Sequence, residues 1–169
     1  MDSQRFCSEI ARLELKYLEL RKEVHAAALA CGCYQSPILE VVFNEKGRGV
    51  VAKRDIHKGE IICPYEGELL TRCEGLRRYQ ADENSCFLFF FRHQEKSWCI
   101  DASRENFTFG RLFNHSRVSP NLKPVARMIG RTPIIEFIAK KDIPRGDELL
   151  WNYGEVDRDV LSQNPWLRS

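Results

Sequence analysis

The sequence predicts a mostly β (α+β) domain that follows one N-terminal helix. Many short, β-prone segments separated by turns follow Pro37, and only two further short helices are indicated. A doubly wound sheet would instead alternate strands with longer helices. A chain of 169 residues fits one compact domain with short appendages. We therefore expect a helical flank over 1–36, a β-rich domain over 37–155 and a C-terminal flanking helix within 156–169.

Residues 3 to about 30 predict one amphipathic helix that ends near Gly32. Its apolar residues recur every three or four positions, at Ile10, Leu13, Tyr17, Leu20, Val24 and Ala27. Such a stripe suits a coiled coil, a partner-binding helix or a helix packed on its own domain. Because three heptads are too few to specify a coiled coil, packing on the domain is favoured.

Eight segments rich in β-branched and aromatic residues predict strands. They span 38–43, 49–52, 60–65, 86–91, 98–101, 125–129, 134–139 and 148–153. Gly130-Arg131 lies between two of them and predicts a tight hairpin. Residues 72–81 and 156–164 predict short helices. The phenylalanines of the fourth segment are expected to fill the core on both faces of a buried strand: Phe87, Phe89, Phe90 and Phe91.

Two nine-residue segments resemble each other, 52–60 and 139–147. Each is predicted to be a strand end, a charged turn closed by glycine, and the start of another strand. Two copies are too few for a repeat array, so we interpret the similarity as the same turn chemistry used twice.

Composition excludes several classes. The net charge of +2 gives no support for a nucleic-acid binder, and basic residues near both ends alternate with acidic ones, as on a solvated surface. The longest apolar run, 86–91, is too short to cross a bilayer, and no secretory leader pattern is present. The seven cysteines have no C-x-x-C spacing, so we expect reduced, mostly buried thiols and no metal site.

Residues 47–52, Gly-Arg-Gly-Val-Val-Ala, fit the loose dinucleotide pattern G-x-G-x-x-A. That pattern requires a helix to begin within it, whereas this segment is β-prone. The glycines therefore indicate a tight turn or a close approach of the backbone to a ligand, and the turn is favoured.

Residues 110–116, Gly-Arg-Leu-Phe-Asn-His-Ser, bring several hydrogen-bonding groups together. His115 could be a general base, a ligand-binding group or a hydrogen-bonded core histidine, and the residues alone favour the structural role. Metal ligation is the weakest choice because no second histidine or cysteine is near.

Residues 148–154 place Trp151 and Tyr153 on one face of a strand. They could form an ordinary packed aromatic pair or a narrow aromatic slot with one hydroxyl at its end. Tyr65 could supply a further wall.

The order of these motifs along the chain resembles that of SET-domain lysine methyltransferases. The resemblance rests on 46–49, 65–67, 111–116 and 146–154, and covers about 37–169. The ending 164–168, the lack of a cysteine-rich tail and the helix over 3–30 resemble the histone H4 lysine-twenty monomethyltransferases. The resemblance implies a SET-domain fold of several small β-sheets with a threaded C-terminal segment.

The resemblance also implies the site. S-adenosylmethionine would be held by Lys46, Gly47, Arg48, Phe87, Asn114, His115 and Trp166, with Trp166 stacked on the adenine. Tyr153 would be catalytic, and the substrate lysine would enter a channel lined by Tyr65, Cys86 and Trp151. No metal is implied. The implied partner is the histone H4 tail in a nucleosome, with possible DNA contact, for a monomeric enzyme in the nucleus on chromosomes, with no membrane association.

Three residues depart from the family pattern. Trp151 stands where Tyr or Phe is usual, Phe87 stands where the branch has Tyr, and Asn152 replaces a frequent Asp. Because an indole is larger than a phenol, we expect a restricted slot and mainly monomethylation. Two other hypotheses stay open: a methyltransferase of a non-histone protein, and a catalytically weak SET fold that serves as a chromatin-binding module.

Overall fold

The computed structural model describes residues 34–44, 47–81 and 87–154. All elements discussed below belong to the compact unit Ser36–Ser169. The predicted helices over 3–30 and 156–164, and the site candidates Lys46, Cys86 and Trp166, lie outside the described residues. The predicted domain limits stay predictions.

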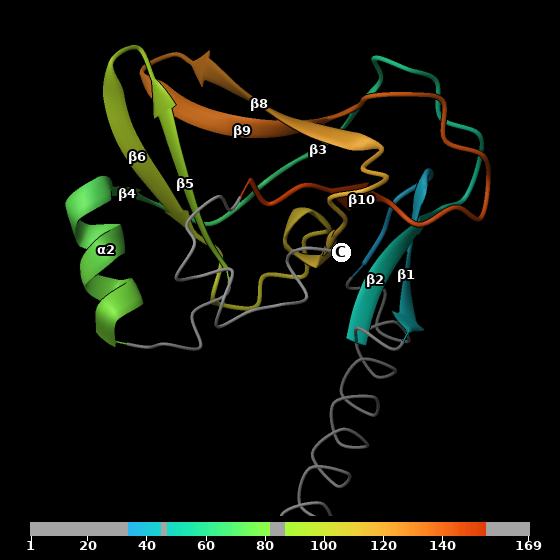
Figure 1. Cartoon of the computed structure of the whole chain (residues 1–169), viewed down its shortest axis with the longest axis horizontal. Coiled ribbons are helices and arrows are strands. Elements are labelled where there is room, and N and C mark those ends of the chain that lie inside the picture. The colour runs from blue at the N-terminus through green and yellow to red at the C-terminus, as the bar shows by residue number, and fades with distance from the viewer. Residues whose placement is uncertain (1–33, 45–46, 82–86, 155–169) are drawn as a thin grey trace, which may run out of the picture. The chain divides into compact units, whose positions relative to one another are not determined.

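Three small sheets make up the described part of the chain (Figure 1). A two-stranded sheet pairs β1 (Leu39–Asn44) with β2 (Gly47–Ala52). A five-stranded sheet has the order β3 (Ile61–Pro64), β9 (Thr132–Ala139), β8 (Leu122–Ile129), β10 (Leu150–Trp151) and β7 (Asn114–His115). A three-stranded sheet has the order β4 (Glu68–Thr71), β6 (Lys96–Asp101) and β5 (Leu88–His93). This architecture confirms the β-rich class with several small sheets.

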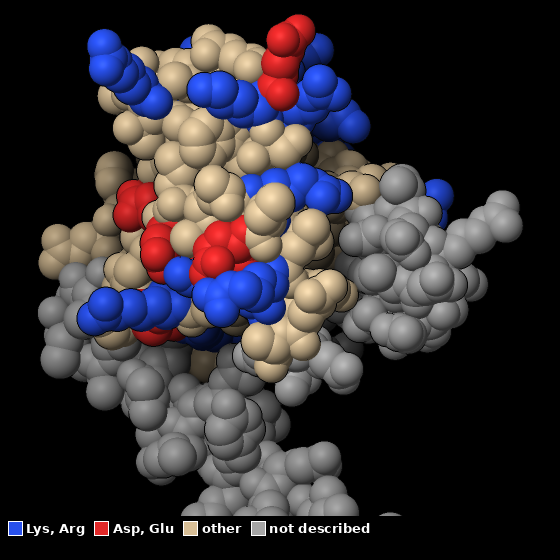
Figure 2. All heavy atoms as spheres, turned by 90° about the vertical axis from the view of Figure 1, so that its left-hand side faces the viewer, with Lys and Arg blue, Asp and Glu red and all other residues tan. Residues whose placement is uncertain are grey.

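Two helical segments complement the sheets. Helix α2 spans Arg72–Ala81, the predicted limits, and lies against the β4-β6-β5 sheet (Figure 1). A 3-10 turn, η1 (Gly110–Leu112), leads into β7. On the α2 side of the molecule acidic and basic side chains are intermixed (Figure 2). Arg78, for example, pairs with Glu68 and Asp101 at 2.7 Å each.

The first seven predicted strands are present with shifted ends, whereas the eighth prediction, 148–153, was wrong in length. Only Leu150–Trp151 is strand, because the backbone N–H of Tyr153 bonds to a histidine side chain and leaves the ladder. The predictions also missed β4 and β7, which are too short to show a period. The phenylalanines of β5 are not core on both faces: β5 is an edge strand, and Phe90 is 37% exposed.

The hydrophobic core is centred on the β8-β9 hairpin, which pairs in continuous register from Leu122 with Ala139 to Ile129 with Thr132. Gly130 closes it with a φ of 61°, so the hairpin predicted at Gly130-Arg131 is confirmed. The largest fully buried side chains include Phe137, Ile135 and Leu122 from this hairpin, together with Phe113. β10 and β7 extend the same sheet beside β8.

The two similar segments 52–60 and 139–147 pair with each other about a local two-fold axis. At its centre Ile56 and Ile143 exchange backbone hydrogen bonds of 2.9 and 2.8 Å. Gly59 N–H donates to the Ala139 carbonyl, and Gly146 N–H donates to that of Ala52, both at 2.8 Å. The glycines have φ values of 91° and 90°, which confirms the shared turn chemistry.

The turns are also capped reciprocally by aspartates. Asp55 Oδ1 accepts the N–H of Arg145 at 2.8 Å, and Asp142 Oδ1 accepts the N–H of Lys58 at 2.7 Å. Each segment therefore supplies the cap that the other needs. Together they tie the chain before β3 to the chain before β10.

Burial differs among the described thiols. Burial raises the pKa of Cys63 to about 12 and that of Cys99 to about 11, and Glu66 and Asp101 add to these effects. Cys73, in the first turn of α2, is exposed, whereas Cys99 is buried and Cys63 is half-buried, so Cys73 is the exception to the expected burial among the three described thiols. Within the described ranges, no group of three His, Cys, Asp or Glu side chains could hold a metal, and no helix has the length and apolar character to cross a membrane.

The first prediction concerns the reciprocal caps. Asp55→Ala and Asp142→Ala are each expected to lower the free energy of unfolding by about 1 kcal/mol, because a backbone N–H loses a charged acceptor. Urea denaturation of the full chain measures this. Asp147→Ala is the matched control, because the hydrogen bonds of Asp147 in the turn involve its backbone. Equal losses in all three variants would contradict the capping role.

The second prediction concerns the thiols. Brief alkylation of the native protein, followed by peptide mass spectrometry, is expected to label Cys73 well before the half-buried Cys63 and the buried Cys99, since a shielded thiol with a raised pKa reacts slowly. Labelling in urea is the control and should remove the difference. Fast native labelling of Cys63 would contradict the burial.

Candidate active site

An aromatic cluster surrounds Trp151, which is only 7% exposed. Its indole stacks on Phe89 with ring centroids 5.1 Å apart, and it meets Phe137 edge-on at 5.2 Å. The Tyr153 ring lies 4.6 Å from it, so the pairing predicted from the i, i+2 spacing is confirmed. Phe89 and Phe137 were not predicted as site residues, because nothing in the sequence ties them to Trp151.

Tyr153 is held by hydrogen bonds at both its backbone and its side chain. Its hydroxyl donates to the carbonyl of Phe113 at 3.0 Å, and its backbone N–H donates to His115 Nδ1 at 3.1 Å. The Trp151 indole N–H donates to the same Phe113 carbonyl at 3.3 Å. Because the hydroxyl gives its only proton to Phe113, its oxygen can meet an incoming group only as an acceptor.

His115 is 4% exposed, and its ring lies 5.0 Å from that of Tyr153. Because Nδ1 accepts the Tyr153 N–H, the neutral ring carries its proton on Nε2. Nδ1 is therefore occupied by the backbone and cannot take a substrate proton. Of the three roles that the sequence left open, this geometry disfavours the general base, and it gives Nδ1 a task in positioning Tyr153.

Tyr65 joins the same cluster from the chain just after β3. Its ring lies 5.3 Å from Phe89 and 6.2 Å from Phe137, and its hydroxyl donates to the Phe87 carbonyl at 2.8 Å. Tyr65 and Trp151, both predicted to line the lysine channel, are thus brought together by Phe89. The result is a buried, largely apolar wall with hydroxyl groups directed by backbone carbonyls.

A second group of predicted residues meets at the start of β2. Gly47 has a φ of 97°, which suits the turn before β2, and Asn114 Nδ2 donates to the Arg48 carbonyl at 3.2 Å. The glycines belong to a strand and no helix begins there, so the exclusion of a dinucleotide-binding turn is confirmed. Gly47, Arg48 and Asn114 therefore form one local structure.

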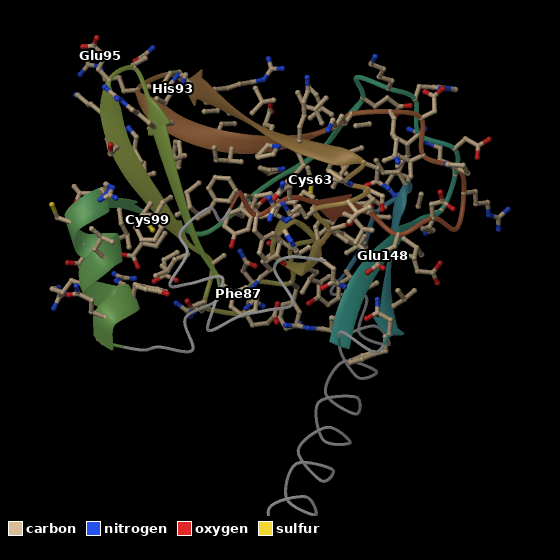
Figure 3. All side chains as sticks on the ribbon, viewed as in Figure 1. Cys63, Phe87, His93, Glu95, Cys99 and Glu148 are labelled. Carbon is tan, nitrogen blue, oxygen red and sulfur yellow. The ribbon has the colours of Figure 1, made fainter. Side chains whose placement is uncertain are left out.

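Glu148 organises this structure, although its role was not predicted. Its Oε1 accepts from Asn114 Nδ2 at 2.8 Å and from Asn44 Nδ2 at 2.9 Å, beside β2 (Figure 3). A Cβ on Gly49 would lie 2.6 Å from the same oxygen, so a larger residue there would displace the Glu148 carboxylate from its present position. The close approach is thus to a protein carboxylate that the sequence did not point to.

The orientation of the Asn114 amide follows from these partners. A carboxylate and a carbonyl can only accept, so the NH₂ group must face Glu148 and Arg48. The amide oxygen is then left as the acceptor for a ligand. A ligand with N–H donors, such as the ammonium or adenine amino group of S-adenosylmethionine, fits this arrangement.

Glu105 links the start of β2, through Arg48, to the aromatic wall, and it too was missed by sequence reasoning. One carboxylate oxygen lies 2.6 Å from Arg48 Nη1 and 2.5 Å from Arg111 Nη1. Partial burial would raise the pKa of Glu105, but the two guanidinium groups outweigh it and lower the pKa to about 2. The Arg111 guanidinium also lies 4.1 Å from the centroid of the Phe87 ring, at the start of β5 (Figure 3).

A groove of about 960 Å³ lies beside this site. Tyr65 and Glu105 border it, together with Glu66, Asp101 and Pro133, but Trp151, Tyr153, Asn114 and His115 do not. This groove therefore adjoins the aromatic cluster at Tyr65 but does not include the predicted catalytic tyrosine. We place the candidate site by the hydrogen-bonded cluster and not by the groove.

Comparison with known proteins agrees with this geometry. The chain is 39% identical over 128 residues to the N-lysine methyltransferase KMT5A of Xenopus tropicalis, covering 73% of this chain and 38% of that protein. It is also 39% identical over 129 residues to the histone-lysine N-methyltransferase Set8 of Drosophila melanogaster, covering 74% and 18% respectively. The chain thus spans less than two fifths of the length of these curated relatives.

Solved structures show the same similarity. The crystal structure of CpSET8 from Cryptosporidium superposes with a TM-score of 0.64 at 31% identity, covering 82% of this chain and 67% of that one. The model of the SET domain family matches residues 47–154, more than half of the chain and the whole of the site described above. The chain belongs to the SET domain family.

Proposed function

We propose that this chain is an S-adenosylmethionine-dependent protein-lysine N-methyltransferase that adds one methyl group to a histone tail, with lysine 20 of histone H4 as the target. The observation that carries the proposal is the Tyr153 hydroxyl, held by the Phe113 carbonyl at the edge of a buried aromatic cluster. The names of the two curated relatives, an N-lysine and a histone-lysine methyltransferase, support it.

The residues at the start of β2, together with the two residues of β7, fit the cofactor. S-adenosylmethionine supplies an electrophilic methyl group when it is bound. Gly47, Arg48, Asn114 and His115 would hold it, with Asn114 offering an oriented acceptor. Lys46, Phe87 and Trp166 complete the proposed set.

The aromatic wall prepares the substrate amine. A lysine amine has an ordinary pKa of about 10.4 and is largely a non-nucleophilic ammonium at neutral pH. Burial between Tyr65 and Trp151, which are each 7% exposed, disfavours the charged form and lowers the amine pKa. Cys86 is proposed as a further wall residue. The amine then reaches the reaction with its lone pair exposed.

Tyr153 guides the amine. Its oxygen, with its proton given to Phe113, accepts a hydrogen bond from the amine and orients the lone pair. The carbonyls of Phe113 and Phe87 each accept two protein donors, so neither is left to orient the amine. The task therefore falls mainly on Tyr153, and no covalent bond to the protein is needed.

Trp151 limits the product. Its indole is fixed by Phe89 on one side and by the hydrogen bond to Phe113, so it cannot swing away without losing both contacts. A fixed indole beside Tyr153 leaves little room for methyl groups on the lysine nitrogen. This supports monomethylation.

Two alternatives remain as outcomes of the tests. A methyltransferase of a non-histone protein would use the same site, and a panel of H4 and non-histone peptides separates the two. A chromatin-binding module would bind the peptide without turnover. The H4 tail within a nucleosome, with possible DNA contact, is the proposed partner of a monomeric enzyme that acts on chromosomes in the nucleus.

The third prediction is that Tyr153→Phe lowers turnover about 100-fold or more, because the amine loses its guide. The assay is methyl transfer from labelled S-adenosylmethionine to nucleosomes. Cofactor affinity, measured by calorimetry, should stay within about threefold of wild type because the ring and its packing are kept. Full activity of Tyr153→Phe would contradict the assignment.

The fourth prediction concerns the methylation state. Wild type is expected to give mainly monomethyl-lysine when the reaction is run to completion, and Trp151→Phe is expected to give di- and trimethyl products because a smaller ring widens the slot. Mass spectrometry of an H4 peptide measures both. Mainly trimethyl product from wild type would contradict the restriction by Trp151.

A further inference from the structure

We propose that Glu105 is a positioning residue. It fixes the start of β2, where Gly47 and Arg48 would hold the cofactor, relative to Tyr65, a proposed wall of the lysine channel. The inference rests on the proposed function, since it assigns Glu105 a task within that site. Glu105 is not proposed to touch cofactor or substrate. It acts through two arginines.

On the cofactor side, Glu105 holds Arg48. Its carboxylate pairs with Arg48 Nη1 at 2.6 Å, and the Arg48 backbone carbonyl in turn accepts from Asn114 at 3.2 Å. Asn114 is the residue whose amide oxygen is proposed to meet the cofactor. Loss of the carboxylate therefore frees the Arg48 side chain and loosens the start of β2, where the carbonyl that holds this amide lies.

On the substrate side, Glu105 holds Arg111. The Arg111 side chain is 3% exposed, and its other nitrogens donate to the carbonyls of Ala102 at 2.8 Å and Ser103 at 3.3 Å. Glu105 is the only carboxylate that pairs with Arg111 in the described ranges. Without it, a buried guanidinium would lack its counter-charge and would move toward solvent.

Movement of Arg111 would displace Phe87 and, through it, Tyr65. The guanidinium packs on the Phe87 ring at 4.1 Å, and the Phe87 carbonyl accepts the Tyr65 hydroxyl at 2.8 Å. Tyr65 is one of the proposed walls of the lysine channel. One carboxylate thus connects two chains of contact, one ending at Asn114 and the other at Tyr65.

The loop around Glu105 is built to hold the carboxylate in place. Glu105 Oε1 accepts the N–H of Phe107 at 3.1 Å, and Phe107 has a φ of 56°, which is unusual for a residue other than glycine. The Asn106 side chain accepts the N–H and the hydroxyl of Thr108 at 3.3 and 2.8 Å. Such a backbone persists only when its surroundings support it.

A simple stabilising ion pair is the competing explanation. The ion pair of Arg127 with Glu136, at 2.8 Å, joins β8 to β9 and involves neither Arg48 of β2 nor Phe87. Glu136→Gln is therefore the matched control. It removes one carboxylate charge from an ion pair outside the proposed network.

The experiment compares wild type, Glu105→Gln and Glu136→Gln as full chains. Calorimetry with S-adenosylmethionine gives the cofactor Kd, steady-state kinetics on an H4 peptide give KM and kcat, and urea denaturation gives stability. We expect Glu105→Gln to raise both the cofactor Kd and the peptide KM about tenfold. Glu136→Gln should stay within about twofold of wild type.

Several outcomes would overturn the proposal. If Glu105→Gln folds and is less stable but keeps the wild-type cofactor Kd and peptide KM, Glu105 only stabilises the fold through its ion pairs. If Glu105→Gln does not fold, Glu105→Asp is measured, because its shorter carboxylate cannot bridge both arginines as they lie. An unchanged Kd there also overturns the proposal. Failure of wild type to bind the cofactor would instead refute the proposed function.

Discussion

The carbonyl of Phe113 is the group on which the candidate site depends. It accepts the Trp151 indole N–H and the Tyr153 hydroxyl, and so fixes the two side chains that would limit and guide the substrate amine. Phe113 is itself 1% exposed and packs edge-on against Phe137 at 5.0 Å. The acceptor therefore cannot shift without opening the core, which gives the site its rigidity.

The C-terminal strand reaches this carbonyl because several long-range hydrogen bonds direct it there. Leu149 N–H donates to the Val50 carbonyl at 2.8 Å, and β10 then enters between β7 and β8 in parallel with both. The reciprocal turns over 52–60 and 139–147 set the approach. Tertiary pairing of similar segments thus delivers Trp151 and Tyr153 to a site formed by distant strands.

Charge plays a complementary part at the edge of the cluster. Glu148 fixes the Asn114 amide, and Glu105 compensates two arginines, one of them buried. Neither carboxylate could be identified from its sequence neighbours, since a glutamate in a charged segment is usually solvated. Asn114 lies 34 residues from Glu148 along the chain, and Arg48 lies 57 residues from Glu105. Only folding makes these pairs.

The sequence by itself determined the β-rich class, helix α2, the hairpin at Gly130 and the pairing of Trp151 with Tyr153, because short-range periodicity and turn chemistry decide such features. The resemblance of its motifs pointed to the family. The tertiary structure decided that Phe89 and Phe137 enclose the indole, that Glu148 and Glu105 bind the side chains of Asn114 and Arg48, and that the two similar turns pair. These features depend on contacts between residues far apart in the chain, for which a single sequence carries no local pattern.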